Sequence, residues 1–306
     1  MKPIDFMGKR KIATVVSAVL LLISLGSLAV SGLNRGLDFT GGSLVEVGFA
    51  DPIEAEEVRT FLEASGFENG TVQYFGANTD VLIRMPPQEG VDRSNLGDNI
   101  FAALQETYPG VQLRQSSFVG PAVGQELTED AGLALLTALI VVMLYILFRF
   151  TKQFSVGAVS ALAHDVFIVL GFFSVFQWTF DLTVLAALLA VIGYSLNDTI
   201  VVSDRIRENF RKVRKGTPIE VINESLNQTL GRTLVTSMTT LFVLLALLVA
   251  GGEVIRGFAI ALCIGVVVGT YSSIFVAANV LLVLNITRED LLVPEREEET
   301  TDGSYP

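Results

Sequence analysis

Two of the residue types that most often carry protein chemistry are almost missing from this sequence. Among 306 residues there is one cysteine, Cys263, and one histidine, His164. A single cysteine excludes an intrachain disulfide and a thiolate metal site. The sequence also has no Walker-type phosphate loop, no glycine-rich nucleotide fingerprint and no nucleophile paired with a base. We therefore expect neither an enzyme nor a bound cofactor or metal, and any work that the chain performs must draw on something other than ATP.

Charged residues are also scarce over long stretches, and 51% of the residues are hydrophobic. Apolar runs close to the ~20 residues that cross a bilayer occur at 12–33, 131–148, 154–178, 182–203, 233–250 and 257–284. The first run is longer than the ~7–15-residue core of a cleaved signal peptide, so we interpret it as a retained anchor. The sequence predicts a polytopic α-helical membrane protein with six transmembrane helices.

Lysine and arginine concentrate in the short segments on one side of these runs. Four lie in residues 1–11, two in 149–153 and six in 204–216, whereas Arg256 alone lies in the short loops on the other side. The positive-inside rule then places both termini in the cytoplasm. We expect a cytoplasmic loop at 204–232 that contains a short helix starting at a capping box of Thr217 and Glu220. The charged tail, 287–306, is expected to be cytoplasmic and disordered.

The segment 34–130, between the first two apolar runs, predicts one extracytoplasmic α+β domain. The stretches "SLVEVGFA", "TVQYFG", "DVLIRMP" and "GVQLRQSSFVG" alternate as strands do, while "IEAEEVRTFLEASG" and "SNLGDNIFAALQETYP" have helical spacing. The resulting βαββαβ order is a ferredoxin-like pattern. Sixteen Asp and Glu residues against five Lys and Arg argue against nucleic acid as a partner. With no catalytic constellation in it, this segment is interpreted as a docking or substrate-handling domain.

The fourth apolar run, within "AVIGYSLNDTIVVSDRIREN", contains an ionisable residue, Asp198. It lies six residues before Asp204, which on a helix places it ~9 Å deeper along the axis. Ionised Asp inside a span costs about 2.5–3.5 kcal/mol, so such residues usually mark ion or proton pathways. Tyr194 and Ser195 share its helix face, and Asn197 lies beside it. We interpret Asp198 as a group that binds and releases a proton as its surroundings change; a hydrogen-bonded Asp that locks helices together is the alternative.

Two further ionisable features lie within the apolar runs. His164 and Asp165 fall near the middle of the third run, where a histidine can relay protons or simply pack. Arg232 starts the fifth run, where it can extend to the cytoplasmic interface or turn inward as the counter-charge of Asp198, which is the interpretation we prefer. The coupling ion is taken to be the proton, with sodium left open.

Several stretches of the chain match a known family. They are "GLDFTGGSLVEV", which contains Asp38, Phe39, Thr40, Gly41 and Gly42; "FVGPAVGQEL"; "SALAHDV"; and "IGYSLNDTIVVSDRIRENFRKVRKGTP" followed by "SLNQTLGRTLVTSMTTL". With these motifs the chain resembles the SecF branch of the bacterial SecD/SecF family, in the resistance-nodulation-division superfamily. The resemblance extends from residue 1 to about residue 290.

The resemblance implies a function that composition and spacing do not. It implies an inner-membrane subunit that works with SecD beside the SecYEG channel, with 34–130 in the periplasm, and that uses the proton gradient to promote export of an unfolded preprotein. The essential carboxylate of the family matches Asp198, and its basic residue at the start of the fifth span matches Arg232. We expect proton coupling through Asp198 and Arg232, supported by Asn197, His164 and Asp165. A proton-coupled small-molecule exporter and a passive assembly subunit are the alternatives.

Overall fold

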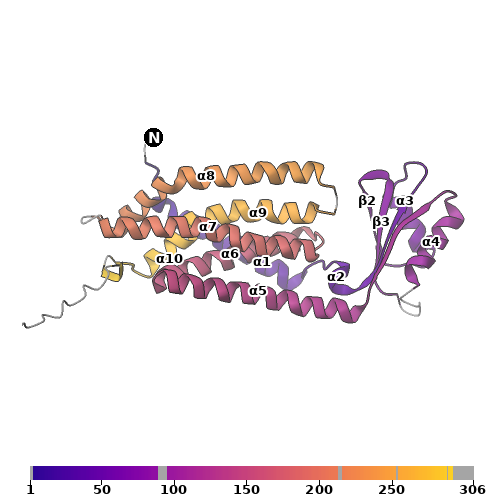
Figure 1. Cartoon of the computed structure of the whole chain (residues 1–306), viewed down its shortest axis with the longest axis horizontal. Coiled ribbons are helices and arrows are strands. Elements are labelled where there is room, and N and C mark those ends of the chain that lie inside the picture. Colours follow the sequence, from indigo (N-terminus) through magenta and orange to yellow (C-terminus); the bar gives the residue numbers. More distant parts are fainter. Residues whose placement is uncertain (1–2, 89–94, 213–215, 253, 288, 292–306) are drawn as a thin grey trace, which may run out of the picture.

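A computed structural model of the chain describes residues 3–88, 95–212, 216–252, 254–287 and 289–291. Figure 1 shows an elongated molecule in which a bundle of long helices carries a small α+β domain at one end. The short helix α2 (Leu37–Thr40) and the first turns of α5 (Pro121–Arg149) connect the two parts.

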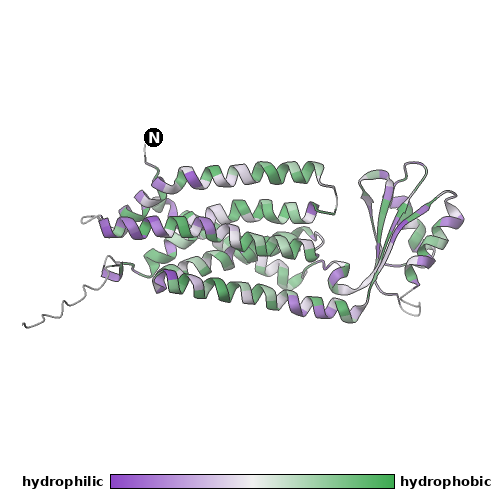
Figure 2. Cartoon of the chain, viewed as in Figure 1, coloured by the Kyte–Doolittle hydropathy of each residue, from purple (hydrophilic) through white to green (hydrophobic). Residues whose placement is uncertain are grey.

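The bundle consists of helices that are long and apolar enough to cross a membrane. Within the described residues there are six such segments, which confirms the predicted number. Figure 2 shows that their apolar residues occupy the middle of the bundle and that hydrophilic residues gather at its ends. The segments are α1 (Arg10–Val30, after the 3₁₀ turn Met7–Lys9), α5, α6 (Lys152–Phe176), α7 (Leu182–Lys212), α8 (Pro218–Ala250) and α9 (Arg256–Ser272), which continues through the π-helical turn Ser273–Ala277 into α10 (Ala278–Val283).

Several helix ends differ from those expected. Helix α5 begins at Pro121, so residues 121–130, predicted to lie in the outer domain, form its first turns. Residues 204–212 and 218–232 are helical as parts of α7 and α8, and the separate short helix predicted between the spans is the start of α8. The physical reason is that hydropathy marks where a helix enters the apolar layer, whereas the backbone hydrogen bonds continue until a cap or a proline ends them.

Two local predictions for the expected cytoplasmic side concern the start of α8 and the C-terminal tail. The capping box at the start of α8 is present: the Thr217 amide donates to Glu220 Oε2 (2.8 Å), and the Glu220 amide donates to Thr217 Oγ1 (3.3 Å). Most of the predicted disordered tail, 287–306, lies outside the described residues. Its first part contains the 3₁₀ turn Glu289–Leu291, in which Leu291 is buried.

The outer domain has the predicted βαββαβ order. Its strands form an antiparallel sheet in the order β2-β3-β1-β4. Side chains of α3 and α4 and the inward side chains of β1 and β3 make one apolar core. The hairpin is tighter than expected, because β3 begins at Ala77, directly after Gly76. The elements are β1 (Gly42–Gly48), α3 (Ala55–Ala64), β2 (Thr71–Phe75), β3 (Ala77–Met85), α4 (Leu96–Thr107) and β4 (Gln112–Val119).

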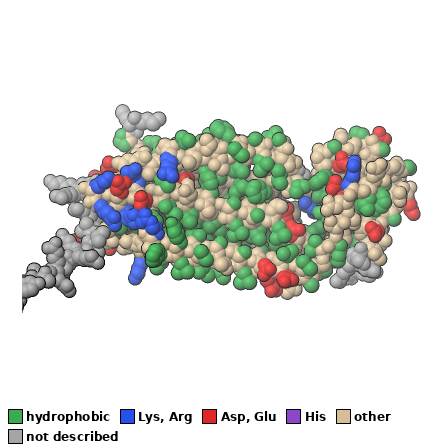
Figure 3. Space-filling model, viewed as in Figure 1, with side chains coloured by type: hydrophobic (Ala, Val, Ile, Leu, Met, Phe, Trp, Pro, Cys, Tyr) green, Lys and Arg blue, Asp and Glu red, His purple; other side chains and the backbone are tan. Residues whose placement is uncertain are grey.

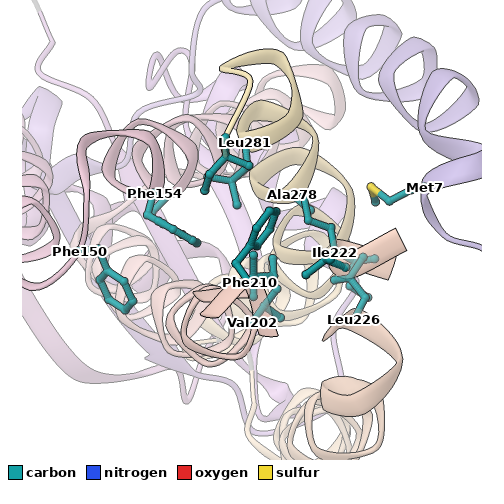
Figure 4. Packing of buried hydrophobic residues seen from close by; sticks show 14 of the residues in the cluster. Met7, Phe150, Phe154, Val202, Phe210, Ile222, Leu226, Ala278 and Leu281 are labelled. Atoms are coloured by element: carbon teal, nitrogen blue, oxygen red, sulfur yellow. The ribbon is translucent and has the colours of Figure 1, made fainter. Parts of the chain in front are cut away.

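Helices α6, α7 and α9 form the centre of the bundle, while α1, α5 and α8 present exposed apolar side chains outward. Two apolar clusters lie at the two ends of this centre. One surrounds Phe39, Phe173 and Phe180 beside the outer domain. The other, at the end remote from the outer domain, joins five helices and the N-terminal turn; Figure 4 shows Met7, Phe154, Phe210, Leu226 and Leu281 within it.

Candidate functional site

Asp198 is a buried carboxylate on α7. The residue is 3% exposed, and its Oδ2 atom has no hydrogen-bond partner in the described part of the chain. The same holds for the buried side-chain oxygens of Tyr194 and Thr199 on α7 and of Thr233 on α8. Burial of polar atoms without partners is unfavourable unless water or an ion satisfies them. This part of the bundle is therefore polar and incompletely bonded.

The structure does not bring Arg232 or Asn197 into contact with Asp198. Both residues are exposed. The charge of Arg232 acts on the Asp198 carboxylate through space, but within the described residues no hydrogen bond or ion pair joins the two side chains. The pairing of Arg232 with Asp198 and the supporting role of Asn197 therefore stay predictions.

A cavity of about 300 Å³, lined by charged and apolar residues, lies at the end of the bundle remote from the outer domain. Ile200 and Val201, two and three residues after Asp198, form part of its wall. At a rise of ~1.5 Å per residue, they lie less than one helical turn from Asp198. Figure 3 shows that basic and acidic side chains gather on this end of the surface. Other lining residues are Arg149, Phe150, Asp204, Arg205, Glu208, Gln228, Thr229 and Arg232.

A second polar centre surrounds Asp165 on α6, which is fully buried. Its Oδ1 atom bonds to Nδ1 of the neighbouring His164 (2.9 Å). Its Oδ2 atom accepts hydrogen bonds from Ser195 Oγ on α7 (2.6 Å) and from Ser272 Oγ on α9 (2.7 Å). Unlike Asp198, this carboxylate is therefore well bonded, and it ties together the three central helices.

The hydrogen bonds continue from His164 to α1. His164 Nε2 bonds to Ser17 Oγ (3.2 Å), which bonds in turn to the Tyr271 hydroxyl (3.0 Å). The Tyr271 hydroxyl also donates to the carbonyl of Ala13 (2.7 Å), and its ring stacks on the His164 imidazole with 6.1 Å between centroids. The π-helical turn of the last span begins one residue after Ser272, and such turns frequently occur at functional sites. We call this set of groups, Asp165, His164, Ser17, Tyr271, Ser195 and Ser272, the Asp165 network.

Glycines on the central helices allow these side chains to meet. A Cβ on Gly269 of α9 would lie 2.9 Å from Ser195 Cβ, and one on Gly265 would overlap Val191 of α7. Close backbone approach of this kind is the usual role of small residues in membrane helix packing. The predictions named His164 and Asp165 and placed Ser195 on the face of Asp198. They missed Ser17, Tyr271 and Ser272, whose hydroxyls carry no charge that would single them out in an apolar run.

The predicted motif from Asp38 to Gly42 lies where the outer domain meets the bundle. Asp38 Oδ2 accepts a hydrogen bond from the Leu182 amide at the start of α7 (3.0 Å). The Phe39 ring stacks on Phe180 with 5.8 Å between centroids. Gly41 and Gly42 have φ of 74° and 137°, a region that favours glycine. A Cβ on Gly41 would also lie 2.9 Å from Pro121 Cα. The motif thus forms a tight joint between β1, α5 and the α6–α7 turn.

Comparison with known proteins gives the family. The model of the family "Protein export membrane protein SecD/SecF, C-terminal" matches residues 99–287, and that of the "SecD/SecF GG Motif" matches residues 26–53. The chain is 52% identical over 299 residues to the protein translocase subunit SecF of Vibrio alginolyticus, covering 97% of this chain and 95% of that one. It is 48% identical over 301 residues to SecF of Pseudomonas aeruginosa, covering 98% and 97%.

A solved structure shows the same fold. The crystal structure of SecDF from Thermus thermophilus, a translocon-associated membrane protein, superposes with a TM-score of 0.82 and 38% identity. The match covers 92% of this chain and 39% of the SecDF chain, so this chain spans less than half of that protein. A structure of SecDF in a super-membrane-facing form gives a TM-score of 0.71. Matching motifs, full-length relatives and fold agree: the chain is a multi-pass membrane protein and belongs to the SecD/SecF family of protein-export proteins, with SecF as the member it matches along almost its whole length.

Proposed function

We propose that this chain, together with SecD, couples proton movement through its helix bundle to the export of preproteins. The observation that carries the proposal is the buried, unpartnered Oδ2 of Asp198 in the middle of α7. A carboxylate at this depth is unfavourable while it is charged and unbonded. It therefore needs either a proton or a counter-charge, and it changes between the two states if the surrounding helices move.

The cavity at the remote end of the bundle supplies a route for the proton. It is large enough for water, it is lined by charged side chains, and its wall reaches Ile200, close to Asp198. Basic residues gather at this end, which supports a cytoplasmic location for it and a periplasmic location for the outer domain. In this arrangement the proton passes from the periplasmic side to Asp198 and leaves through the cavity.

Arg232 is the proposed switchable partner of the Asp198 carboxylate. It lines the cavity and its field acts on Asp198. A rotation of α8 that brought the guanidinium inward would stabilise ionised Asp198, and the outward position in the structure suits the protonated state. Asn197 is proposed to assist from the exposed face of α7.

The Asp165 network is proposed to transmit the movement of α7 to the rest of the bundle. Because Ser195 of α7 bonds to Asp165, and His164 reaches Ser17 of α1, a shift of α7 displaces α6 and α1 as well. Helix α1 ends at Val30, and residues 31–37 connect it to the Asp38–Gly42 joint below the outer domain. One charge moved through 100 mV is worth about 2.3 kcal/mol, so each proton supplies a small stroke and export needs repeated cycles.

The partners follow from the family rather than from contacts in the structure. The chain covers 39% of the SecDF chain, and we propose that SecD supplies the remainder, including the second half of the membrane domain. SecYEG as the channel and an unfolded preprotein as the substrate belong to the same proposal.

A passive assembly subunit is the second candidate. The observation that favours it is that both oxygens of Asp165 are hydrogen-bonded. A buried carboxylate bonded in this way can have a purely structural role, which is to hold helices together. Under this alternative Asp198 is also structural, and its removal lowers the yield of the complex with SecD without changing the activity of the complex that forms.

Export by membrane vesicles that contain this chain, SecD and SecYEG tests the proposal. We expect Asp198→Asn to abolish the part of export that depends on an imposed proton gradient while the complex assembles at normal yield. Asp51→Asn, which alters an exposed carboxylate of the outer domain, is the control and is expected to export normally. Full gradient-dependent export by the Asp198→Asn complex contradicts proton coupling through this residue, and a reduced yield with normal activity supports the assembly subunit.

A further inference from the structure

An almost wholly apolar cavity of about 200 Å³ lies between α2, α5, α6 and α7, beneath the outer domain. Its wall includes the apolar side chains of Phe39, Leu135, Leu170, Phe180 and Leu188. Gly132 of α5 is also a lining residue, and a Cβ at this position would have no atom within 4 Å. The cavity does not belong to the proton site, since neither Asp198 nor the Asp165 network contributes to its wall.

A cavity of about 420 Å³ adjoins the apolar one, and the two share Arg35, Phe39 and Thr128. Its wall carries both signs of charge, with the exposed Arg35 and with Glu129, whose Oε1 accepts a hydrogen bond from Gln125 Nε2 (3.1 Å). Together the two cavities form an apolar hollow with a cationic and an anionic group at its rim.

The rim lies at the depth where α5 enters the apolar layer. Glu126, Glu129 and Asp130 are the charged residues of its first turns, and the next charged residue of the helix is Arg149 at its other end. Figure 3 shows acidic side chains on the bundle close to its boundary with the outer domain. Lipid headgroups occupy this depth, and acyl chains lie just below it.

We propose that a zwitterionic phospholipid of the phosphatidylethanolamine class binds here. One acyl chain fills the apolar cavity, the phosphate accepts hydrogen bonds from the Arg35 guanidinium, and the headgroup ammonium pairs with Glu129. The arginine guanidinium is well suited to bind a phosphate group. An acyl chain in an apolar cavity makes dispersion contacts that the empty cavity lacks. Because Phe39 belongs to the joint below the outer domain, the lipid supports that joint from the membrane side. The inference does not depend on proton coupling.

The single tryptophan provides a probe. Trp178 packs edge-on against Phe173 (5.7 Å between centroids), which packs edge-on against the cavity residue Phe180 (6.2 Å). Phosphatidylethanolamine brominated on its acyl chains is titrated into the full chain in detergent, and quenching of Trp178 fluorescence is recorded. We expect a saturable component of one lipid per chain that inorganic phosphate does not displace, and weaker binding of brominated phosphatidylglycerol, since Glu129 repels an anionic headgroup.

Three variants distinguish lipid binding in the cavity from general contact between lipid and the bundle. Gly132→Leu adds a large side chain to the wall of the apolar cavity and is expected to abolish the saturable component. Gly26→Leu, at an open helical position on α1, is the matched control and is expected to retain it. Arg35→Gln is expected to weaken the binding of brominated phosphatidylethanolamine about tenfold or more, as the loss of a charged hydrogen bond predicts.

Two results overturn the inference. Quenching that does not saturate, or that is the same in Gly132→Leu and Gly26→Leu, shows only the lipid that surrounds the bundle and refutes the site. Saturable binding that is unchanged in Arg35→Gln, or that is tighter for brominated phosphatidylglycerol, refutes the assignment of the headgroup.

Discussion

The two buried aspartates of the bundle differ in how their oxygens are bonded. Both oxygens of Asp165 have partners on His164, Ser195 and Ser272, at 2.6–2.9 Å. Asp198 Oδ2 has none in the described part of the chain. Hydrogen bonds to a charged group contribute about 1.5–3 kcal/mol each, and a donor that loses its partner inside a protein is costly. Asp165 is therefore suited to hold helices together, and Asp198 to change its state.

Alanine substitutions at these two aspartates are expected to differ in stability. Asp165→Ala removes the acceptor of the Ser195 hydroxyl and breaks the hydrogen bonds to His164 and Ser272, so we expect it to lower the free energy of unfolding by about 1–3 kcal/mol more than Asp198→Ala. The two substitutions remove the same atoms, which makes each the control for the other. Unfolding of the full chain in detergent measures the difference, and equal losses would show that the Asp165 network contributes no specific stability.

The sequence revealed part of these centres. Asp198, His164 and Asp165 were found because ionisable residues are rare inside apolar runs. Ser17, Tyr271 and Ser272 were not found, because hydroxyl residues in such helices commonly bond to their own backbone, as Thr236 does to the Arg232 carbonyl (3.1 Å). Which hydroxyls bond between helices depends on how the helices rotate against each other, and this is a property of the packed bundle.

At the scale of elements, the contact between α7 and α9 depends on two glycines. Gly269 lies against Ser195, and Gly265 lies against Val191. The short distance between the helices brings Ser195 and Ser272 to the same oxygen of Asp165. Packing and hydrogen bonding are thus coupled at this contact.

Enlarging Gly269 is expected to separate the two helices. Gly269→Val should lower the free energy of unfolding by about 1–3 kcal/mol, the usual range for overpacking, because a Cβ would meet Ser195. Gly193→Val, at an open position of α7, should have little effect. Thermal unfolding of both variants makes the comparison, and a stable Gly269→Val protein would mean that α7 and α9 do not approach as closely as described.

The start of α8 depends on the Thr217 cap. Thr217→Ala removes the acceptor of the Glu220 amide and is expected to cost about 1 kcal/mol, whereas Thr217→Ser keeps the hydroxyl and should cost much less. Hydrogen exchange at the first turn of α8 measures the effect locally. Equal exchange in the two variants would show that the cap does not stabilise this helix end.

At the scale of the whole molecule, the outer domain and the bundle meet at the Asp38–Gly42 joint. Asp38 bonds to the start of α7, Phe39 packs on Phe180, and Gly41 lies against Pro121 at the start of α5. Two separate segments, the α6–α7 turn with the start of α7 and the start of α5, therefore contact these five residues. The joint is therefore one route by which a movement of the bundle can reach the outer domain.

Alanine at Gly42 tests how tight the joint is. An alanine at position 42 would have a positive φ, and its Cβ would overlap the Met85 carbonyl oxygen. An alanine at position 76 would also have a positive φ (84°), but its Cβ would lie in open space. We expect Gly42→Ala to lower the free energy of unfolding by about 1–3 kcal/mol more than Gly76→Ala. Denaturant unfolding of the full-length variants measures both, and a similar loss in the two would refute the close approach.

Much of the architecture could be predicted from the sequence. Six apolar runs and the alternation of the four strands are local signals, and they identified the bundle and the βαββαβ domain. The extent of α5, α7 and α8 beyond the apolar layer was not predicted, because charged residues continue a helix as readily as apolar ones do. That α9 joins α6 and α7 at the centre was not visible either, since its apolar run, 257–284, contains no ionisable side chain of Asp, Glu, Lys, Arg or His.

Proton flux tests the central claim, that Asp198 carries the coupling proton, most directly. Proteoliposomes containing this chain and SecD, with a pH-sensitive dye inside, are given a proton gradient, and the rate of internal acidification is measured. We predict a flux for the unaltered chain that Asp198→Asn abolishes and Asp51→Asn leaves unchanged. Equal acidification rates for the Asp198→Asn protein and the unaltered chain would contradict the account.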